Sequence, residues 1–582
     1  MTVTRHPVTV ERGVPCPMRD GTVLLADIYR PKGEGPFPVL LVRTPYDRFH
    51  SQANLYAHPS WYAQQGYVVV SQDVRGRWRS EGDWYPFFNE ANDGFDTIAW
   101  AAQLPGTTGQ VGMYGASYVG ATQMLAAITS PPALRVICPA ITSSDYYEGW
   151  TYEGGALHLA FVIYWALQLA MDTARRRSDE DTLRRLAEAS TTYTIGQHQM
   201  YLPLEELPLF RESRVLGYFF DWLRHPTYDE YWQQVAIAPR HDRILAAGLH
   251  IGGWYDIFLD GTLANFTGIQ ANGGSPFARQ HQRLIIGPWY HSPWTPFCGE
   301  ADFGPRASSR IVDETQIRFY NWLLKGEDDG ISREPPVKLF VMGENVWRDE
   351  QEWPLRRAVS TPFYFHSGGL ANAFTGDGTL STERPGEEPP DVYVYDPRTP
   401  AVSRGGHSCC REHLDPQGRY DQRLVERNKD VLCYTSDPLD APLEVTGPVS
   451  VTLWAATSAV DTDWVVRLVD VYPDGRAMNV TEGILRARFR DSLQSPSLLE
   501  RDRVYEYRIN LRATSNVFLP GHRIRVDVAS SSFPHWDRNP NTGAPIATVP
   551  LSQVETATQT VFHDAARPSH ILLPVVPRPR GL

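Results

Sequence analysis

Short hydrophobic runs alternate with helical stretches between residue 22 and about residue 143. Such alternation is typical of a largely parallel sheet covered by helices. Two of the runs are almost entirely apolar, as expected of strands that are buried on both faces. The predicted strands are residues 23–29, 39–43, 67–72, 110–114 and 136–139.

The pattern becomes helical and aromatic between residues 144 and 240. Residues 156–171 are almost uniformly apolar, and residues 179–189 are amphipathic, with Ser178 as the expected N-cap. An apolar helical insertion in an α/β domain commonly forms a lid over the strand ends where ligands bind, although it can also be a subdomain without substrate contact. Sheet-like runs resume at 244–249 and 283–286.

Helical periodicity largely disappears after about residue 355. Alternating or β-branched runs at 449–454, 465–471 and 523–528 predict a β-sandwich of jelly-roll type, with a loop at 384–390. We therefore expect three domains. They are a discontinuous α/β domain (1–143 and 241–354), a helical cap (144–240) and a jelly-roll domain (355–582).

Composition and charge narrow the class of protein. The 582 residues carry a net charge of −12, which argues against nucleic acid or an anionic membrane as a partner. We find no signal-peptide pattern and no apolar stretch near the ~18 residues of a membrane span, and we expect a cytoplasmic enzyme. Six scattered cysteines, without C-x-x-C or H-E-x-x-H, imply neither a metal nor another cofactor. Cys409 and Cys410 are adjacent, and we expect reduced thiols in a loop.

A serine in a glycine-flanked turn is the strongest candidate for chemistry. Ser117 lies between Gly115 and Gly120, directly after an apolar run. A strand that enters a sharp turn and then a helix raises the serine hydroxyl above the sheet edge, with the next backbone N–H facing a developing oxyanion. The motif departs from G-x-S-x-G because Val119 takes the second glycine's place, so an idle serine in a glycine-rich turn remains an alternative.

A base and a carboxylate follow two later strands. Asp256 comes after the strand ending near residue 249, and His291 after the strand ending at residue 286. Both therefore lie at the carboxyl edge of the sheet, and the order Ser117, Asp256, His291 is that of α/β-hydrolases. The alternatives are His241 or His250 as the base and Asp260 as the carboxylate.

Tyr46 follows an early buried strand, in a position from which a second oxyanion donor can come, although a tyrosine there more often packs in a core. Several segments together make the chain resemble the cocaine esterase family of serine hydrolases, whose relatives include X-prolyl dipeptidyl aminopeptidases and α-amino acid ester hydrolases. The resemblance covers nearly the whole chain and rests on residues 45–47, 72–76, 115–120, 253–256, 287–292, 340–343, 347–348, 514–523 and 537–539.

The resemblance implies a Ser117–His291–Asp256 triad, with the Tyr46 hydroxyl and the Tyr118 backbone N–H as the oxyanion hole. It also implies an α/β-hydrolase core with an inserted helical lid domain and a C-terminal β jelly-roll domain. Tryptophans of the helical domain line the acyl pocket in this family, and Trp150 and Trp165 occupy matching places. In the family a leucine–phenylalanine pair contributes to the site for the acyl group, but this chain has residues 405–410 there instead. Its acyl group can therefore differ in shape.

These expectations point to a serine esterase that acts on a small-molecule ester or amide. The resemblance adds that members of this family can be homodimers. The near alternative is amide hydrolysis, either as an X-prolyl dipeptidyl aminopeptidase or as a β-lactam acylase. An X-prolyl enzyme must hold a free ammonium group with a carboxylate, but we expect the cap's candidates to be solvated on helix surfaces. These candidates are Glu148, Glu153 and Asp172. A distant alternative is a non-catalytic carbohydrate-binding protein.

Overall fold

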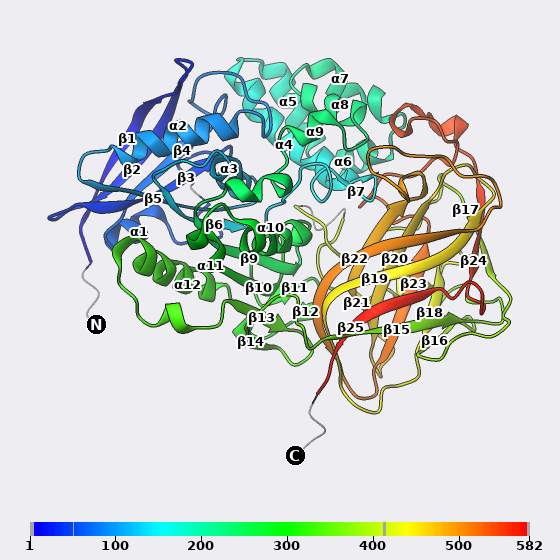
Figure 1. The fold of residues 1–582 in the computed structure, drawn as a ribbon. Helices are drawn as coiled ribbons and strands as arrows, with labels where there is room; N and C mark the ends of the chain where they lie inside the picture. Colours follow the sequence, from blue (N-terminus) through cyan, green and yellow to red (C-terminus); the bar gives the residue numbers. More distant parts are fainter. Residues whose placement is uncertain (1–4, 51, 411–414, 579–582) are drawn as a thin grey trace.

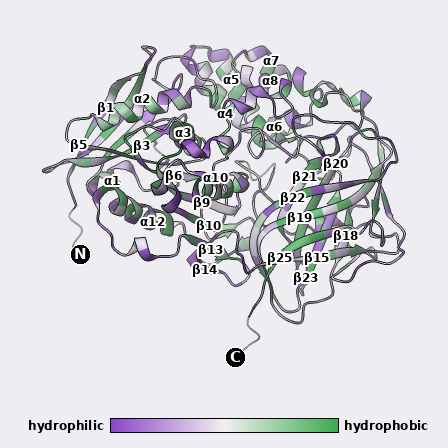
Figure 2. Ribbon diagram, in the orientation of Figure 1, coloured by the Kyte–Doolittle hydropathy of each residue, from purple (hydrophilic) through white to green (hydrophobic). Residues whose placement is uncertain are grey.

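The computed structural model describes residues 5–50, 52–410 and 415–578, with the backbone alone at 192–195. Figure 1 shows an α/β core, a helical cap above it and a β domain beside both. In Figure 2 hydrophobic positions concentrate along the strands of both large sheets. Among the described residues, no helix is both long enough and apolar enough to cross a membrane.

The core is a ten-stranded sheet that is parallel from β4 through β13 and antiparallel at its edges. Each predicted strand lies within or next to one of its strands. The order is β1 (Val8–Pro17), β2 (Val23–Pro31), β4 (Val68–Asp73), β3 (Phe37–Thr44), β5 (Thr107–Ala116), β6 (Leu134–Ala140), β9 (Ala247–Tyr255), β10 (Gln282–Tyr290), β13 (Val337–Val341) and β14 (Val346–Glu350).

Side chains along β3 alternate between two separate cores, as the two-residue period of a strand requires. Val39 and Leu41 pack with α2 (Glu90–Ala102) and α3 (Tyr118–Ala127). Leu40 and Val42 pack on the other face. The helices on that face are α1 (Pro59–Gln64) and α12 (Arg310–Tyr320), and α10 (Leu259–Asn272) and α11 (Pro276–Gln280) connect β9 to β10. Helices on both faces explain why these strands are apolar runs.

The cap lies between β6 and β9 in the sequence, and its apolar residues share a core with α2 and α3. The apolar run at 156–171 begins in a short hairpin, and the helix starts only at Leu159. The cap consists of the hairpin β7 (Tyr152–Glu153) and β8 (Ala156–Leu157), then α4 (Leu159–Arg176), α5 (Glu180–Ala189), α6 (Thr192–Met200), α7 (Pro208–Ser213), α8 (Gly217–Arg224) and α9 (Glu230–Gln233).

The expected N-cap of α5 was wrong by one residue. Asp179, not Ser178, accepts a hydrogen bond from the Thr182 N–H at 3.0 Å. Ser178 has a φ of 54°, so it belongs to the turn before the helix. Asp and Ser cap helices about equally well, and sequence preference therefore could not separate them.

The C-terminal β domain contains one eleven-stranded sheet around its own apolar core. The predicted runs at 449–454, 465–471 and 523–528 lie in its strands, and residues 384–390 lie outside helices and strands. The jelly-roll connectivity stays a prediction. Its strands are β15 (Val359–His366), β16 (Thr379–Ser381), β17 (Asp391–Tyr395), β18 (Leu432–Thr435), β19 (Leu443–Thr457), β20 (Asp463–Val471), β21 (Ala477–Arg486), β22 (Tyr505–Phe518), β23 (Arg523–Ala529), β24 (Ala557–Phe562) and β25 (His570–Val576).

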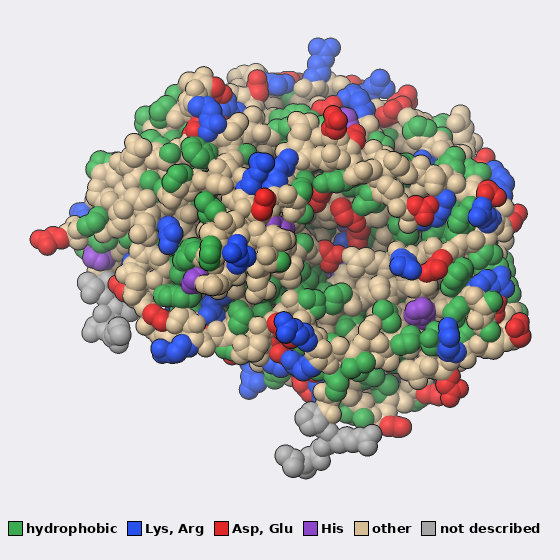
Figure 3. Space-filling view, in the orientation of Figure 1, with side chains coloured by type: hydrophobic (Ala, Val, Ile, Leu, Met, Phe, Trp, Pro, Cys, Tyr) green, Lys and Arg blue, Asp and Glu red, His purple; other side chains and the backbone are tan. Residues whose placement is uncertain are grey.

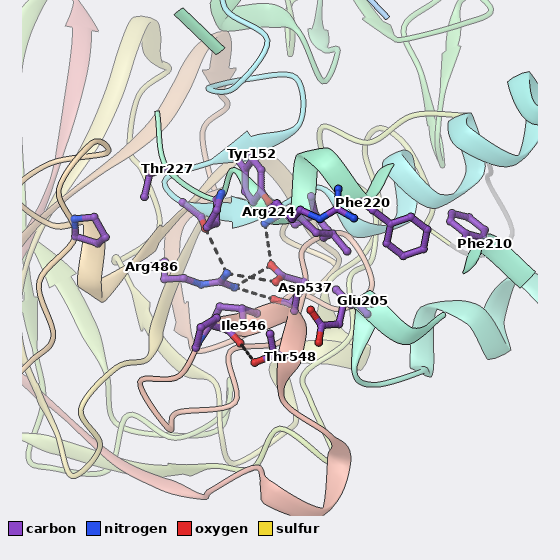
Figure 4. Close-up of a pocket in the computed structure, with 18 of the residues that line it drawn as sticks. Tyr152, Glu205, Phe210, Phe220, Arg224, Thr227, Arg486, Asp537, Ile546 and Thr548 are labelled. Atoms are coloured by element: carbon purple, nitrogen blue, oxygen red, sulfur yellow. Dashed lines mark hydrogen bonds and ion pairs between the residues drawn. The ribbon is translucent and has the colours of Figure 1, made fainter. Parts of the chain in front are cut away.

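Arg486 joins the β domain to the cap. Its buried guanidinium donates to both Asp463 oxygens at 2.9 Å and to Asp537 Oδ1 at 2.8 Å. Asp537 Oδ1 also accepts from the Leu157 N–H of the cap at 2.8 Å. Figure 4 shows Arg486 and Asp537 facing each other beside a cavity between the two units.

Replacing Arg486 with alanine is expected to lower the free energy of unfolding by about 3–5 kcal/mol, because two buried carboxylates lose their cation. Denaturant titration followed by tryptophan fluorescence measures this loss. Arg508→Ala, which removes an exposed ion pair with Glu506, serves as the control and should change stability little. A loss for Arg486→Ala no greater than that for Arg508→Ala would contradict the structural role.

Candidate active site

Ser117 occupies a strained turn between β5 and α3. Its φ of 62° and ψ of −125° lie outside the regions that residues with a side chain prefer. The Ser117 N–H donates to Ala140 O of the neighbouring strand β6 at 3.0 Å. The Gln52 side chain braces the turn, since it donates to Ala116 O at 2.9 Å and accepts from the Ala116 N–H at 2.8 Å. The turn thus holds the serine at the carboxyl end of the parallel strands.

The two glycines of the motif make this turn sterically possible. A Cβ on Gly115, which has a φ of 137°, would lie 2.1 Å from Val119 Cγ1. A Cβ on Gly120 would lie 2.7 Å from Thr142 Cβ and 2.9 Å from Ala140 O. Gly120 therefore lets α3 pack closely on the end of β6, which explains why the second glycine comes one residue late.

Two hydrogen bonds connect Ser117, His291 and Asp256. Ser117 Oγ lies 3.0 Å from His291 Nε2, and His291 Nδ1 lies 2.7 Å from Asp256 Oδ1. Asp256 and His291 come directly after β9 and β10, which are neighbouring parallel strands. All three side chains are buried or nearly so. The fold thus brings a hydroxyl, a base and a carboxylate into the order that serine activation requires.

The alternative bases and carboxylate lie elsewhere. His250 Nε2 bonds to Gln282 Oε1 at 2.9 Å, and burial lowers the pKa of His250 to about 4. His241 Nε2 lies 3.2 Å from Asn265 Oδ1. Asp260, in the first turn of α10, accepts from Asn510 Nδ2 at 2.7 Å. Each of these side chains therefore has a partner that is neither Ser117 nor His291.

Tyr46 lies in the loop after β3 with its hydroxyl beside the site. Trp165 Nε1 of the cap donates to the Tyr46 oxygen at 3.0 Å. Burial of the hydroxyl raises the pKa of Tyr46 to about 12, although hydrogen bonds with Trp165 and Ser117 act in the opposite direction. The phenol is therefore neutral near pH 7 and retains its proton for donation.

The Tyr118 backbone N–H is the first amide of α3, where a helix offers its own N–H groups no acceptor. The Tyr118 side chain points into the core, where its hydroxyl donates to Glu90 Oε1 at 3.0 Å and accepts from the Phe87 N–H at 2.8 Å. The amide thus follows Ser117 at a positive helix end. Together with Tyr46, it provides two donors near the serine.

Aromatic side chains of the cap and core form a wall beside His291. The Trp150 ring stacks on Phe258 at a centroid distance of 4.2 Å, and Phe258 meets the His291 ring edge-on at 5.2 Å. Trp150 and Trp165 lie 6.0 Å apart. Sequence reasoning missed Phe258, although its position two residues after Asp256 offered a signal.

The expectation of reduced thiols at Cys409 and Cys410 was wrong. The structure joins them by a disulfide. The pair lies beside His291, because both sulfur atoms and a ring nitrogen of His291 lie within 4.8 Å of one another. Sequence reasoning missed this proximity, since the cysteines belong to the β domain and the histidine to the core.

The three acidic candidates of the cap are not solvated on helix surfaces, so that expectation was also wrong. Glu153 pairs with Arg512, and Asp172 accepts from the Trp78 N–H at 2.9 Å. Glu148 accepts from the Gly154 N–H at 3.2 Å, and burial raises the pKa of Glu148 to about 8. Acidic side chains also gather in the hollow near the centre of Figure 3. The carboxyl groups of Glu148, Glu153 and Asp172 are therefore all engaged by neighbouring donors of the fold.

Glu153, His158 and His535 form a further buried cluster with ligand atoms within 4.8 Å of one another. The Arg512 guanidinium binds Glu153 in this cluster, and its charge opposes a metal cation there. A cavity of about 670 Å³ lies between the cap and the β domain, lined by residues such as Phe210, Phe220 and Arg486 (Figure 4). No residue of the Ser117 site lines it.

Comparisons with known proteins find relatives that are similar over almost the whole chain. Residues 20–293 match the family described as X-Pro dipeptidyl-peptidase (S15 family), and residues 329–572 match its C-terminal non-catalytic domain. Cocaine esterase of Rhodococcus sp. (strain MB1 Bresler) is 40% identical over 579 residues, which cover 98% of this chain and 99% of that protein.

Two solved structures are similar over almost their full lengths. An aminopeptidase from a marine sediment archaeon (Thaumarchaeota archaeon) has a TM-score of 0.82 and 26% identity, covering 99% of this chain and 97% of its own. An α-amino acid ester hydrolase has a TM-score of 0.77 and 27% identity, covering 99% of this chain and 98% of its own. The protein is thus an α/β-hydrolase with a C-terminal β domain, and the chain belongs to the cocaine esterase family of serine hydrolases.

Proposed function

We propose that this enzyme hydrolyses carboxylic esters through an acyl-Ser117 intermediate. The observation that carries the proposal is the pair of hydrogen bonds from Ser117 Oγ through His291 to Asp256, at 3.0 and 2.7 Å. Ester rather than amide substrates are supported by the name of the 40% identical relative, cocaine esterase. The aromatic wall formed by Trp150 and Phe258 favours an apolar acyl group.

In the proposed reaction His291 Nε2 takes the Ser117 proton while Oγ attacks the ester carbonyl carbon. Asp256 holds the imidazole in the required tautomer and stabilises the imidazolium. The Tyr46 hydroxyl and the Tyr118 N–H donate to the tetrahedral oxyanion. The C–O bond then breaks, and the leaving alkoxide takes the proton from His291. Water repeats these steps on the acyl-enzyme and releases the acid.

We further propose a division of labour among the three expected units. Residues 1–143 and 241–354 supply the reacting groups, and residues 144–240 supply Trp150 and Trp165 to the acyl pocket. Residues 355–582, with jelly-roll connectivity, supply Cys409 and Cys410 beside His291. The contacts of Trp165 with Tyr46 and of both cysteines with the surroundings of His291 support this division.

A substrate panel with a covalent label tests the proposal. Short-chain and aromatic p-nitrophenyl esters are compared with Gly-Pro p-nitroanilide, and a fluorophosphonate is used to label the nucleophile. We expect ester turnover without anilide cleavage, and a single adduct on the peptide that contains Ser117. Anilide cleavage at a comparable kcat/KM would assign the enzyme to exopeptidases instead. A lack of labelling and of turnover would support the non-catalytic alternative.

Replacing Tyr46 with phenylalanine is expected to lower kcat for the best ester about 10²–10³-fold, which corresponds to about 3 kcal/mol, because one oxyanion donor is lost. KM and the thermal midpoint should change little, since the ring remains. Trp165→Phe keeps an aromatic ring at this position but removes the indole N–H that donates a hydrogen bond to the Tyr46 oxygen. It should cost less than about tenfold, as a single supporting hydrogen bond is worth about 1 kcal/mol. Equal losses in kcat for the two variants would argue against Tyr46 as a donor.

A further inference from the structure

Cys409 and Cys410 place two sulfur atoms next to the base of the proposed active site. Both sulfurs and one ring nitrogen of His291 lie within 4.8 Å of one another. Cys409 is buried and packs in the same core as Trp150 and Phe258, whereas Cys410 is half-buried. The three ligand atoms come from two domains, so the folded chain alone brings them together.

The loop that carries the cysteines is held by contacts other than the bond between their sulfurs. The Gly406 N–H donates to Gly418 O at 2.7 Å, and the Gly418 N–H donates to Gly406 O at 2.9 Å. The Ser408 hydroxyl donates to Asp415, which also contacts the imidazole of His535. Because these contacts do not involve sulfur, the loop keeps both cysteines near His291 when the disulfide is reduced.

Reduction changes the chemistry that this place offers. A dithiol reductant supplies two electrons and two protons, the S–S bond becomes two thiols, and the reductant is oxidised to its own disulfide. Two cysteine sulfurs and one imidazole nitrogen are a donor set that suits Zn²⁺ and similar thiophilic cations. Each thiol releases its proton when the cation binds, and the two thiolates balance its charge.

We propose that reduced Cys409 and Cys410, together with His291, form an inhibitory binding site for a thiophilic divalent cation such as Zn²⁺ or Cd²⁺. The site has three protein ligands and leaves a fourth position for water. The oxidised pair has no thiolates and does not bind the cation in this way. The redox state of the pair thus decides whether the metal can reach the enzyme's base.

Metal binding at either ring nitrogen of His291 would inhibit the enzyme. His291 Nδ1 bonds to Asp256 at 2.7 Å and Nε2 bonds to Ser117 at 3.0 Å, so coordination at either nitrogen removes one of the two contacts. The inhibitory effect rests on the proposed function of His291. The binding of metal does not, and it can be measured without any substrate.

Spectroscopic titration tests the binding. The full-length protein is reduced with dithiothreitol. The reductant is then removed under anaerobic conditions, and the protein is titrated with Cd²⁺. We expect thiolate-to-cadmium charge-transfer absorption that saturates at one equivalent, in the wild type and in Ser117→Ala alike. The Cys409→Ser and Cys410→Ser variants should bind about 100-fold more weakly or worse. Cys433→Ala, which removes a buried thiol far from His291 in the sequence, should titrate like the wild type.

The same preparations test the inhibition. Ester hydrolysis by reduced wild type should be lost at one equivalent of Zn²⁺ and restored by a chelator. Protein oxidised with diamide, which accepts the two electrons and two protons, should be unaffected at the same Zn²⁺ concentration. An absorption band that persists when Cys409→Ser and Cys410→Ser are combined in one protein, or equal binding by the oxidised protein, would overturn the site. Stoichiometric Cd²⁺ binding without loss of ester turnover would overturn the inhibitory role of the site. Absence of turnover in the metal-free protein would instead refute the proposed esterase function.

Discussion

Replacing Ser117 with alanine is expected to lower kcat for ester hydrolysis about 10⁶-fold, the largest loss we expect from any single substitution. The reason is that covalent catalysis disappears together with its nucleophile, while His291 and Asp256 have no hydroxyl left to activate. Residual turnover would come from the oxyanion donors and binding alone. Single-turnover kinetics with a p-nitrophenyl ester measures the loss, and the absence of a burst shows that no acyl-enzyme forms.

Ser117→Gly separates loss of the nucleophile from damage to the turn. Ser117 has a φ of 62°, a conformation that costs residues with a Cβ about 1–3 kcal/mol and that glycine adopts freely. Both variants should be equally inactive, but the glycine variant should be more stable than the alanine variant by about 1 kcal/mol. If Ser117→Ala keeps more than a small fraction of activity, or if both variants unfold at ambient temperature, Ser117 cannot be assigned as the nucleophile.

The sequence predicted the parts of the site that depend on local pattern. The apolar runs located β5, β9 and β10, and parallel strands end at one edge of their sheet. That rule alone was enough to expect Ser117, Asp256 and His291 near one another. Gly115 and Gly120 also marked the Ser117 turn in the sequence, because side chains at these two positions would collide with neighbouring atoms.

The parts that were not predictable depend on how the domains pack. The disulfide at Cys409–Cys410 lies beside His291, although more than a hundred residues separate them in the sequence. Glu153 was expected in solvent, yet it pairs with Arg512 from β22 of another domain. Contacts of this kind depend on how the surfaces of two domains fit together. They cannot be predicted from the hydrophobic periodicity or the turn residues of a single segment.

Replacing Asp256 with asparagine is expected to lower kcat about 10⁴-fold, because the amide no longer fixes the imidazole tautomer that accepts the Ser117 proton. Asp256 is fully buried, and the substitution weakens its 2.7 Å contact with His291 Nδ1. Asp260→Asn is the matched control, since Asp260 lies four residues on and bonds to Asn510 instead. It should change kcat less than about tenfold, the value of one neutral hydrogen bond. Comparing kcat of the two variants on one ester decides between the carboxylates: a greater loss for Asp260→Asn would transfer the role to Asp260, and a small loss for both would remove a carboxylate from the mechanism.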